Sequence, residues 1–478
     1  MFLHKNHLSI YLLFSITLIL FIFKLLFNYY LALPLHFDEA QYWDWSRNLD
    51  WGYFSKPPFL AFLIKTITIT CGDTENCIRS LSPILHSFTG VIIYYTVYTI
   101  TRNQYISIFG SLLYLIMPGV IFSSLFISTD APLLLFSSLS ALFIVKIFNN
   151  KNNKSIYFLF LSISLAFGIL SKYAALYILI SIFTSIIFIR ESRKFFINKK
   201  FLLCILGIII IIAPNISWNL QNNFVTFSHT ASNANLQGLQ LNIHSAIFFF
   251  SSQIFIFGII PFVLTFKNII NFKNINVIQK VVFLNFLIPI ILVLFLATFS
   301  RANSNWAVVG YPFGCIFLAS IIDKKKQFLI KACLTNQFIF SFVLLIFIFT
   351  LPNFNIDPFY KIRHIKSLAI QIENELKNTE NVAFMADDRE DFAHLNYYIK
   401  EMDVIKVKWN GDKKIDDHYE LTTSVEDLIN KNVLFLTRTK PTKAMIDRCE
   451  KHEKISSYKF TYGNKERVFN LFLLKSWN

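Results

Sequence analysis

The residues best suited to chemistry begin with two adjacent carboxylates near the N-terminus, in the run His36-Phe37-Asp38-Glu39-Ala40. On a helix, Asp38 and Glu39 would point about 100° apart, so each can serve a different partner. One could face a reaction centre while the other binds a metal or fixes the loop. The alternative is a solvated helix start, where acids are favoured by the helix dipole. The pattern alone leaves both interpretations open.

Basic residues follow in the same stretch. In Tyr53-Phe54-Ser55-Lys56-Pro57-Pro58, the two prolines stop a helix and favour an extended turn, which would hold Lys56 rigidly. Its ammonium could neutralise a phosphate leaving group, or the side chain could reach to lipid headgroups. Arg79 is a second phosphate-binding candidate, because its planar fork contacts oxyanions through two bonds.

Asp130 is the only acid between Glu75 and Glu191, and it lies in Ser128-Thr129-Asp130-Ala131-Pro132. Capping of the following helix is the plainer interpretation of this motif. Lys172 and Arg301 are expected at the same end of the molecule. Together they could form a basic cluster opposite the acids.

Aromatic residues are dense between positions 42 and 54. They predict an amphipathic helix on the membrane surface, with its tryptophans in an interfacial belt. The same helix could wall a groove for a lipid tail. The candidates for that groove are Tyr42, Trp43 and Tyr53.

The elements that must position these residues are membrane helices. The chain of 478 residues is 54% hydrophobic and 15% charged, whereas soluble domains carry about 25% charged residues. Of its net charge of +16, nearly all lies in residues 1–352, which hold 24 Lys and Arg against 9 Asp and Glu. The positive-inside rule explains this excess more simply than nucleic-acid binding, so no nucleic-acid partner is expected.

A span needs about 20 apolar residues. The hydropathy pattern predicts eleven spans, at about 8–31, 84–101, 106–127, 131–148, 155–171, 173–190, 201–217, 245–266, 281–299, 307–322 and 328–351. With the N-terminus in the cytoplasm, the cytoplasmic segments hold 17 basic residues and two acids. This bias places the loop 32–83 and residues 353–478 outside the cytoplasm.

The predicted fold is therefore mainly α. It combines a polytopic membrane domain of residues 1–352, whose external loop 32–83 carries the candidate site, with an extracytoplasmic α/β domain of residues 353–478. The latter mixes charged helical stretches with short strand-like runs, and its length suits an independent fold. Cys71 and Cys77 share the external loop, where they would form a local disulfide or remain free thiols.

The order of motifs resembles bacterial GT-C glycosyltransferases. The closest group is the family-39 type, related to protein O-mannosyltransferases and to the lipid A aminoarabinose transferase. The resemblance covers about residues 30–310 and rests on Asp38-Glu39, Tyr53 to Pro58, Asp130-Ala131-Pro132, Leu170 to Tyr173, Trp218-Asn219 and Asn305-Trp306.

The resemblance implies transfer of a sugar from a polyprenyl-phosphate donor at the outer face of the cytoplasmic membrane. The acceptor would be lipid A or lipopolysaccharide, another glycan, or a protein. Asp38 would match the acid that assists the acceptor, Lys56 the residue that holds the donor phosphate, and Asp130 the second loop acid. Some relatives carry an acid just before this lysine, where this chain has Ser55. A divalent metal therefore stays an open question.

A transporter or lipid flippase is the alternative function for a chain with these spans and charges. Such proteins usually place charges or broken helices near the middle of the bilayer. Here the ionisable residues, apart from Lys24, lie at the ends of the predicted spans. This distribution favours the glycosyltransferase.

Overall fold

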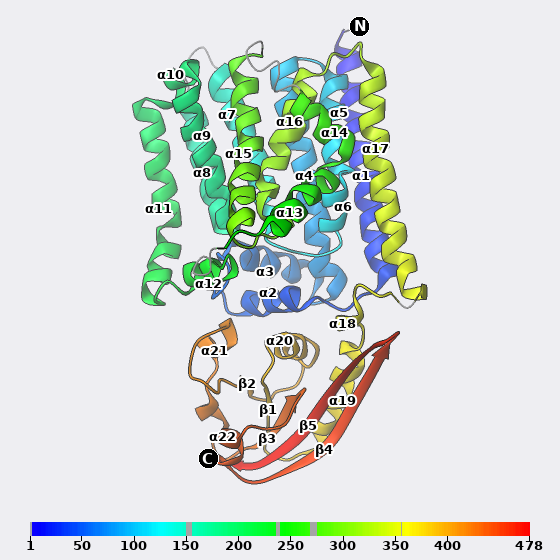
Figure 1. The fold of residues 1–478 in the computed structure, drawn as a ribbon, viewed down its shortest axis with the longest axis vertical. Helices are drawn as coiled ribbons and strands as arrows, with labels where there is room; N and C mark the ends of the chain where they lie inside the picture. Colours follow the sequence, from blue (N-terminus) through cyan, green and yellow to red (C-terminus); the bar gives the residue numbers. More distant parts are fainter. Residues whose placement is uncertain (1, 150–154, 236–239, 268–274, 355) are drawn as a thin grey trace.

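The computed structural model describes residues 2–149, 155–235, 240–267, 275–354 and 356–478. A bundle of apolar helices forms one half of the molecule, and a smaller domain with a β-sheet caps one end of it (Figure 1). The loops that precede helices α4 (Glu75–Thr101) and α7 (Asp130–Asn149) lie at the end of the bundle that faces the sheet domain. The protein is a multi-pass membrane protein.

Seven described helical segments are long and apolar enough to cross a membrane, and nine if each of two bent pairs counts as one span. The pairs bend by 112° between α9 and α10 and by 103° between α13 and α14. The seven are α1 (Phe2–Leu31), α4 (Glu75–Thr101), α7 (Asp130–Asn149), α11 (Lys199–Gln221), α15 (Val277–Phe299), α17 (Gln327–Thr350), and α16 (Tyr311–Ile321) with the preceding η4 (Ser304–Gly310). The pairs comprise η1 (Tyr173–Ala175), α9 (Leu176–Phe188), η2 (Arg190–Ser192) and α10 (Arg193–Phe196), and α13 (Ile243–Phe257) with α14 (Ile259–Lys267).

The remaining predicted spans correspond to shorter helices. The span expected at 155–171 is α8 (Ile156–Ser171). The one expected at 106–127 is divided into α5 (Gln104–Leu115) and α6 (Pro118–Ser123). The division falls at Pro118, which has no N–H to continue α5 but fits the first turn of α6. Three of the basic residues counted as cytoplasmic, Lys151, Lys154 and Lys273, lie outside the described residues.

The first loop forms two helices that lie across the end of the bundle, α2 (Phe37–Arg47) and α3 (Phe59–Cys71) (Figure 1). The short helix α12 (Val225–Asn233) lies at the same end. A capping box starts α2, because His36 accepts from a backbone N–H while the Glu39 side chain accepts from the His36 N–H. Helix α3 was not expected from the sequence.

The expected surface helix with an aromatic belt is wrong for α2. Trp43 and Trp45 are buried, and Trp43 packs edge-on against Tyr397 of the sheet domain at 4.9 Å. The sequence predicted that this helix would face the lipid headgroups, whereas in the structure the sheet domain covers it. Its aromatic residues are interior packing between the two halves of the molecule.

The C-terminal domain contains a five-stranded sheet in the order β2-β1-β3-β5-β4. Strand β1 is parallel to β2 and β3, whereas β5 is antiparallel to β3 and β4. Its elements are η5 (Leu351–Phe354), α18 (Tyr360–Arg363), α19 (Ile365–Asn378), β1 (Val382–Ala386), α20 (Arg389–Tyr398), β2 (Lys406–Lys408), α21 (His418–Thr422), η6 (Val425–Leu428), β3 (Asn432–Thr437), α22 (Lys443–Ile446), β4 (Cys449–Tyr462) and β5 (Lys465–Trp477).

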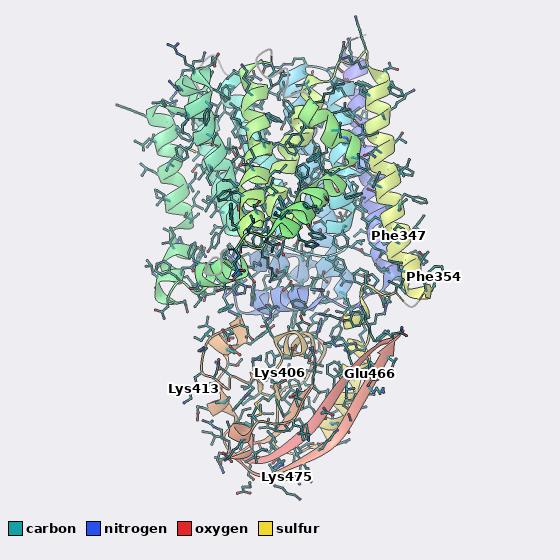
Figure 2. The ribbon with its side chains drawn as sticks, in the orientation of Figure 1. Phe347, Phe354, Lys406, Lys413, Glu466 and Lys475 are labelled. Carbon is teal, nitrogen blue, oxygen red and sulfur yellow. A yellow bond between two sulfur atoms is a disulfide. The ribbon has the colours of Figure 1, made fainter. Side chains whose placement is uncertain are left out.

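One apolar core crosses from the membrane half into the sheet domain. It joins Leu60 and Ile64 of α3 to Phe392 of α20 and Leu434 of β3. The outer surfaces differ, since Phe347 projects exposed from the bundle while Lys413 and Glu466 lie on the outside of the sheet domain (Figure 2). The shared core fixes α2 between the two halves, and α2 carries the first candidate residues of the site.

Candidate active site

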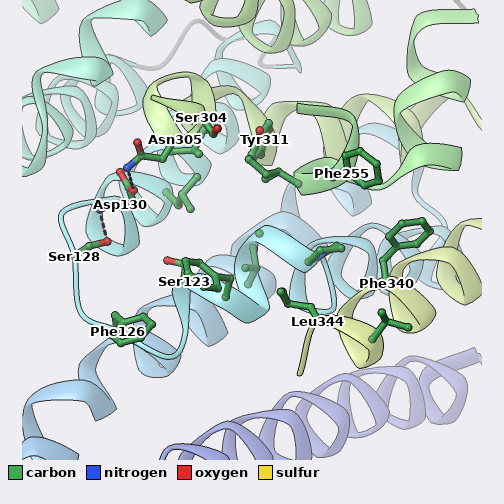
Figure 3. A pocket seen from close by; sticks show the side chains of 18 of the residues that line it. Ser123, Phe126, Ser128, Asp130, Phe255, Ser304, Asn305, Tyr311, Phe340 and Leu344 are labelled. Atoms are coloured by element: carbon green, nitrogen blue, oxygen red, sulfur yellow. Dashed lines mark hydrogen bonds between the residues drawn. The ribbon is translucent and has the colours of Figure 1, made fainter. Parts of the chain in front are cut away.

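Asp130 is held by two donors from distant parts of the chain. Lys172 Nζ lies 2.6 Å from Asp130 Oδ1, and Asn305 Nδ2 lies 2.7 Å from Asp130 Oδ2. The Asp130 carboxylate is therefore held in one orientation by both of its oxygens and is more than a simple helix cap. Ser128 Oγ accepts from the Asp130 N–H and so performs the capping itself (Figure 3).

Asp38 and Lys56 differ from that pair, because both are half-buried and neither has a charge partner. Among the described residues, none lies within hydrogen-bonding or ion-pairing distance of the Asp38 carboxylate or the Lys56 ammonium. Burial lowers the pKa of Lys56, and the neighbouring cation Lys172 lowers it further, whereas Asp38 and Asp130 raise it. Lys172, Asp38 and Asp130 therefore lie close enough to Lys56 for their charges to act on it.

The loop that carries Lys56 is fixed by helices α11 and α12. Asn215 Nδ2 donates to the Trp51 carbonyl at 2.7 Å, and Trp218 Nε1 donates to Asp50 Oδ2 at 2.6 Å. Thr226 Oγ1 donates to the Tyr53 carbonyl at 2.8 Å. These contacts bring the Trp-Asn motif of the sequence to the Lys56 loop.

The close approach of this loop to α11 requires a glycine. A Cβ atom at Gly52 would lie 2.3 Å from the Trp218 ring. No side chain fits there while Trp218 keeps its hydrogen bond to Asp50. The backbone before Lys56 is therefore positioned by packing as well as by the two prolines.

Glu39 and Arg79 bind each other and hold the scaffold. Arg79 Nη2 lies 2.6 Å from Glu39 Oε2, and both side chains are almost fully buried. Arg79 also donates to the carbonyls of Leu33 and Pro34, and Glu39 accepts from the Ile127 N–H at 2.9 Å. The expected catalytic role of Glu39 and phosphate-binding role of Arg79 do not fit this geometry, because their polar atoms are engaged with each other and with the backbone.

A large apolar cavity of about 730 Å³ opens beside Asp130. Its polar end is formed by Ser128, Asp130 and Asn305, and its far end by Phe255 and Phe340 (Figure 3). It runs among α6, α13, α16 and α17. This shape and lining suit a lipid chain whose polar head lies at Asp130.

A second cavity of about 340 Å³ lies between α2 and the sheet domain. Asp38 and Tyr42 line it from one side, and Lys361 and Glu390 line it from the other. Phe126 borders both cavities, and the Arg79 guanidinium lies 5.4 Å from the centre of its ring. The Glu39–Arg79 pair thus supports the wall between the two cavities.

Of the three aromatic candidates for a groove, Tyr42 alone lines one of these two cavities. Trp43 donates to Asp73 Oδ1 at 2.9 Å, and Tyr53 stacks on Trp45 with ring centres 4.4 Å apart. Both serve the packing of the loop. Arg301 is exposed and borders neither cavity.

Cys71 and Cys77 are joined by a disulfide, with Cα atoms 5.8 Å apart. The bond closes the turn between α3 and α4, just before Arg79. It therefore ties the end of the first loop to the helix that carries the buried ion pair.

No group of three or more His, Cys, Asp or Glu side chains that could hold a metal ion occurs within the described part of the chain. Arg389 is a site residue that the sequence analysis missed. It comes from α20 of the sheet domain. Burial is the main cause that lowers the pKa of His229 to about 4, and the positive charge of Arg389 lowers it further. Asn305 belongs to the Asn-Trp motif of the sequence, but its hydrogen bond to Asp130 depends on the fold and appears only in the structure.

Comparison with solved structures assigns the arrangement of these elements. The crystal structure of ArnT from Cupriavidus metallidurans in the apo state matches with a TM-score of 0.65, covering 98% of both chains at 12% identity. The chain has the GT-C fold of ArnT. The structure of that protein bound to undecaprenyl phosphate matches with a TM-score of 0.63, over 96% of this chain and 97% of the other.

Two sequence comparisons agree with this GT-C fold. Residues 55–218 match the family described as dolichyl-phosphate-mannose-protein mannosyltransferase. A lipid A galacturonosyltransferase, RgtD, from Rhizobium johnstonii is 30% identical over 296 residues. The aligned region spans 60% of this chain and 60% of that relative. The resemblance drawn from the motifs is confirmed, and the matched family segment lies inside the stretch on which it rested.

Proposed function

We propose that this protein is a membrane glycosyltransferase that moves a sugar from a polyprenyl-phosphate donor to an envelope acceptor. Lipid A or lipopolysaccharide is the acceptor class that the similarity to the lipid A galacturonosyltransferase favours. The fold shared with a protein solved in complex with undecaprenyl phosphate supports a lipid-linked donor. Membrane lipids would surround the bundle, and the acceptor would enter from the end covered by the sheet domain.

One observation carries the proposal. The Asp38 carboxylate and the Lys56 ammonium, which have no ion-pair partner among the described residues, lie near the Asp130–Lys172 pair, and Asp130 lines the polar end of the apolar cavity. A polyprenyl-phosphate sugar has the matching parts in the same order. Its lipid chain suits the cavity, its phosphate suits Lys56, and its anomeric carbon would then lie near the carboxylates.

The chemistry follows from these charges. An acceptor hydroxyl oxygen attacks the anomeric carbon as the bond from that carbon to the phosphate oxygen breaks. The phosphate leaves with the bonding electrons, and Lys56 stabilises its added charge. Asp38 takes the proton of the hydroxyl, a form of general-base help that typically contributes 10²–10⁴-fold. Asp130, fixed by Lys172 and Asn305, would stabilise the positive charge that develops on the sugar ring.

The test is sugar transfer by the purified protein. It would be incubated with radiolabelled polyprenyl-phosphate sugars and with lipid A, lipopolysaccharide and total envelope acceptors. We expect label on a lipid A-containing acceptor. Label on none of the acceptors with any donor, from protein that is folded, would contradict the proposal. A transporter would instead move a lipid across the membrane without forming a new glycosidic bond, and no observation favours it.

We also propose that the protein lies in the cytoplasmic (inner) membrane of a bacterium. Its sheet domain and its first loop would then lie outside the cytoplasm. The division into residues 1–352 and 353–478 belongs to the same proposal. Alkaline phosphatase fused after residue 352 should be active, and a reporter that works only in the cytoplasm should be silent there. The basic bias of the opposite face is the reason. The reverse result would contradict the assigned sidedness and leave the fold untouched.

A further inference from the structure

Arg389 brings a positive charge from the sheet domain to the membrane half of the site. It is the first residue of α20, and its guanidinium lies 5.1 Å from the centre of the Phe37 ring. Its Nη1 donates to Gln41 Oε1 at 3.3 Å. Among the described residues, no carboxylate lies within ion-pairing distance of it. Most of its five N–H donors are therefore unused.

This position does not favour a cation. The N-terminus of a helix carries a partial positive charge, so acids are stabilised there and basic residues are not. The same turn holds Glu390 and Asp391, which suit the helix dipole. Arg389 thus contributes nothing to helix α20 that a neutral residue would not.

Arg389 also adds to a local excess of positive charge. Lys172 pairs with Asp130, which leaves two cations, Lys56 and Arg389, against one carboxylate, Asp38, without an ion-pair partner among the described residues. Arg389 is one of the cations that lower the pKa of Lys56, after burial and Lys172. Like charges that face each other in a partly buried site raise the free energy of the empty protein. An anion bound between them would lower it.

We propose that Arg389 binds an oxyanion of the lipid-linked donor opposite Lys56, so that the sheet domain forms part of the donor site. The inference rests on the proposed function and deepens it. A guanidinium contacts two oxygens at once, which a phosphate or a carboxylate can provide. The oxyanion is either the phosphate of the donor or a carboxylate carried by its sugar.

The experiment compares full-length protein with Arg389→Gln, Arg389→Lys and a control, Arg448→Gln. Arg448 lies in the same domain, away from the site, with Glu426 at 3.4 Å. Binding is measured with undecaprenyl phosphate alone, and KM with a donor that carries a uronic acid and one that carries a neutral hexose. Melting temperatures are recorded for every variant.

If Arg389 holds the phosphate, Arg389→Gln should weaken undecaprenyl phosphate binding about 10- to 100-fold. If it holds a sugar carboxylate, the KM of the uronic acid donor alone should rise by that factor. Arg389→Lys should restore binding in part, and Arg448→Gln should change neither value. A lowered melting temperature with unchanged Kd and KM would show a merely structural residue and overturn the inference. Failure of the unsubstituted protein to bind undecaprenyl phosphate would contradict the proposed function itself.

Discussion

Two neighbouring carboxylates, Asp38 and Glu39, have opposite surroundings. Glu39 accepts bonds from Arg79 and from two backbone N–H groups, whereas the Asp38 carboxylate borders the second cavity with no partner among the described residues. A carboxylate that is fully engaged cannot take up a proton readily, and a free one can. The helix turn of about 100° between adjacent residues produces this separation.

We expect Asp38→Asn to remove most turnover, by about 10²–10⁴-fold, while leaving the affinity for undecaprenyl phosphate nearly unchanged. The amide keeps the shape of the carboxylate but cannot accept the hydroxyl proton. Steady-state transfer and equilibrium binding would be measured on the same preparation, with exposed Asp412→Asn as control. Normal transfer by folded Asp38→Asn protein would refute the assignment.

Lys56→Ala should weaken both donor binding and turnover, because in the proposed mechanism the ammonium faces the phosphate before and during its departure. Lys56→Arg should recover only part of each, since a planar fork does not replace a compact ammonium between two prolines. Lys65→Ala, in the neighbouring helix α3, serves as the control. A lysine that merely reached lipid headgroups would show unchanged kcat and Kd after substitution.

The residue types near Lys56 could be predicted from the sequence, but their roles depended on contacts that the sequence does not show. Arg79 is a reasonable phosphate ligand until its partner, 40 positions earlier, is seen. Nothing in the local sequence marks Arg389 as a site residue. Its partner Gln41 lies 348 residues away, and Arg389 begins a helix whose sequence looks like that of any surface helix. Spacing reports what lies on one element, and these contacts join separate ones.

At the scale of elements, the Glu39–Arg79 pair fastens α2 to α4 and to the loop before α7. Its bonds reach the backbone at Leu33, Pro34 and Ile127. The wall between the two cavities rests on this joint through Phe126. The sequence periodicity predicted most of the apolar spans and a C-terminal domain with both strands and helices. It could not predict the contact between Glu39 and Arg79.

Glu39→Gln should therefore destabilise the protein by about 3–5 kcal/mol, because it leaves the Arg79 charge buried without its counterion. Thermal unfolding of the purified protein would measure the loss. Activity per folded molecule should fall far less than in Asp38→Asn. As a control, Glu373→Gln, from a partly exposed pair with Lys377, should change the melting temperature little. An unchanged melting temperature with abolished turnover would restore Glu39 as a catalytic group.

At the scale of the whole molecule, the interface between the bundle and the sheet domain contains a half-buried acid, Asp44. Asp44 Oδ1 accepts from Asn396 Nδ2 at 2.7 Å. Burial raises the pKa of Asp44 from 3.8 to about 6. The folded protein therefore holds this proton more tightly than the unfolded chain does.

The stability contributed by protonated Asp44 should be present below about pH 4 and lost as pH rises to about 6. Asp44→Asn should thus be more stable than the original protein at pH 7, by at most about 3 kcal/mol, with the difference shrinking toward pH 4.5. Melting temperatures across this range measure it, with Asp412→Asn as control. A difference that does not vary with pH would contradict the argument.

The burial of α2 beneath α20 also dictates the order in which the protein matures. Asn396 is synthesised 352 residues after Asp44, and Tyr397 324 residues after Asp73, yet each pair is in contact. When every span has been synthesised and inserted, the ribosome has not yet produced the sheet domain that covers the first loop. The nascent chain therefore holds Asp38 without the sheet-domain side of its cavity, and the proposed site is complete only after the last domain has folded onto the membrane half.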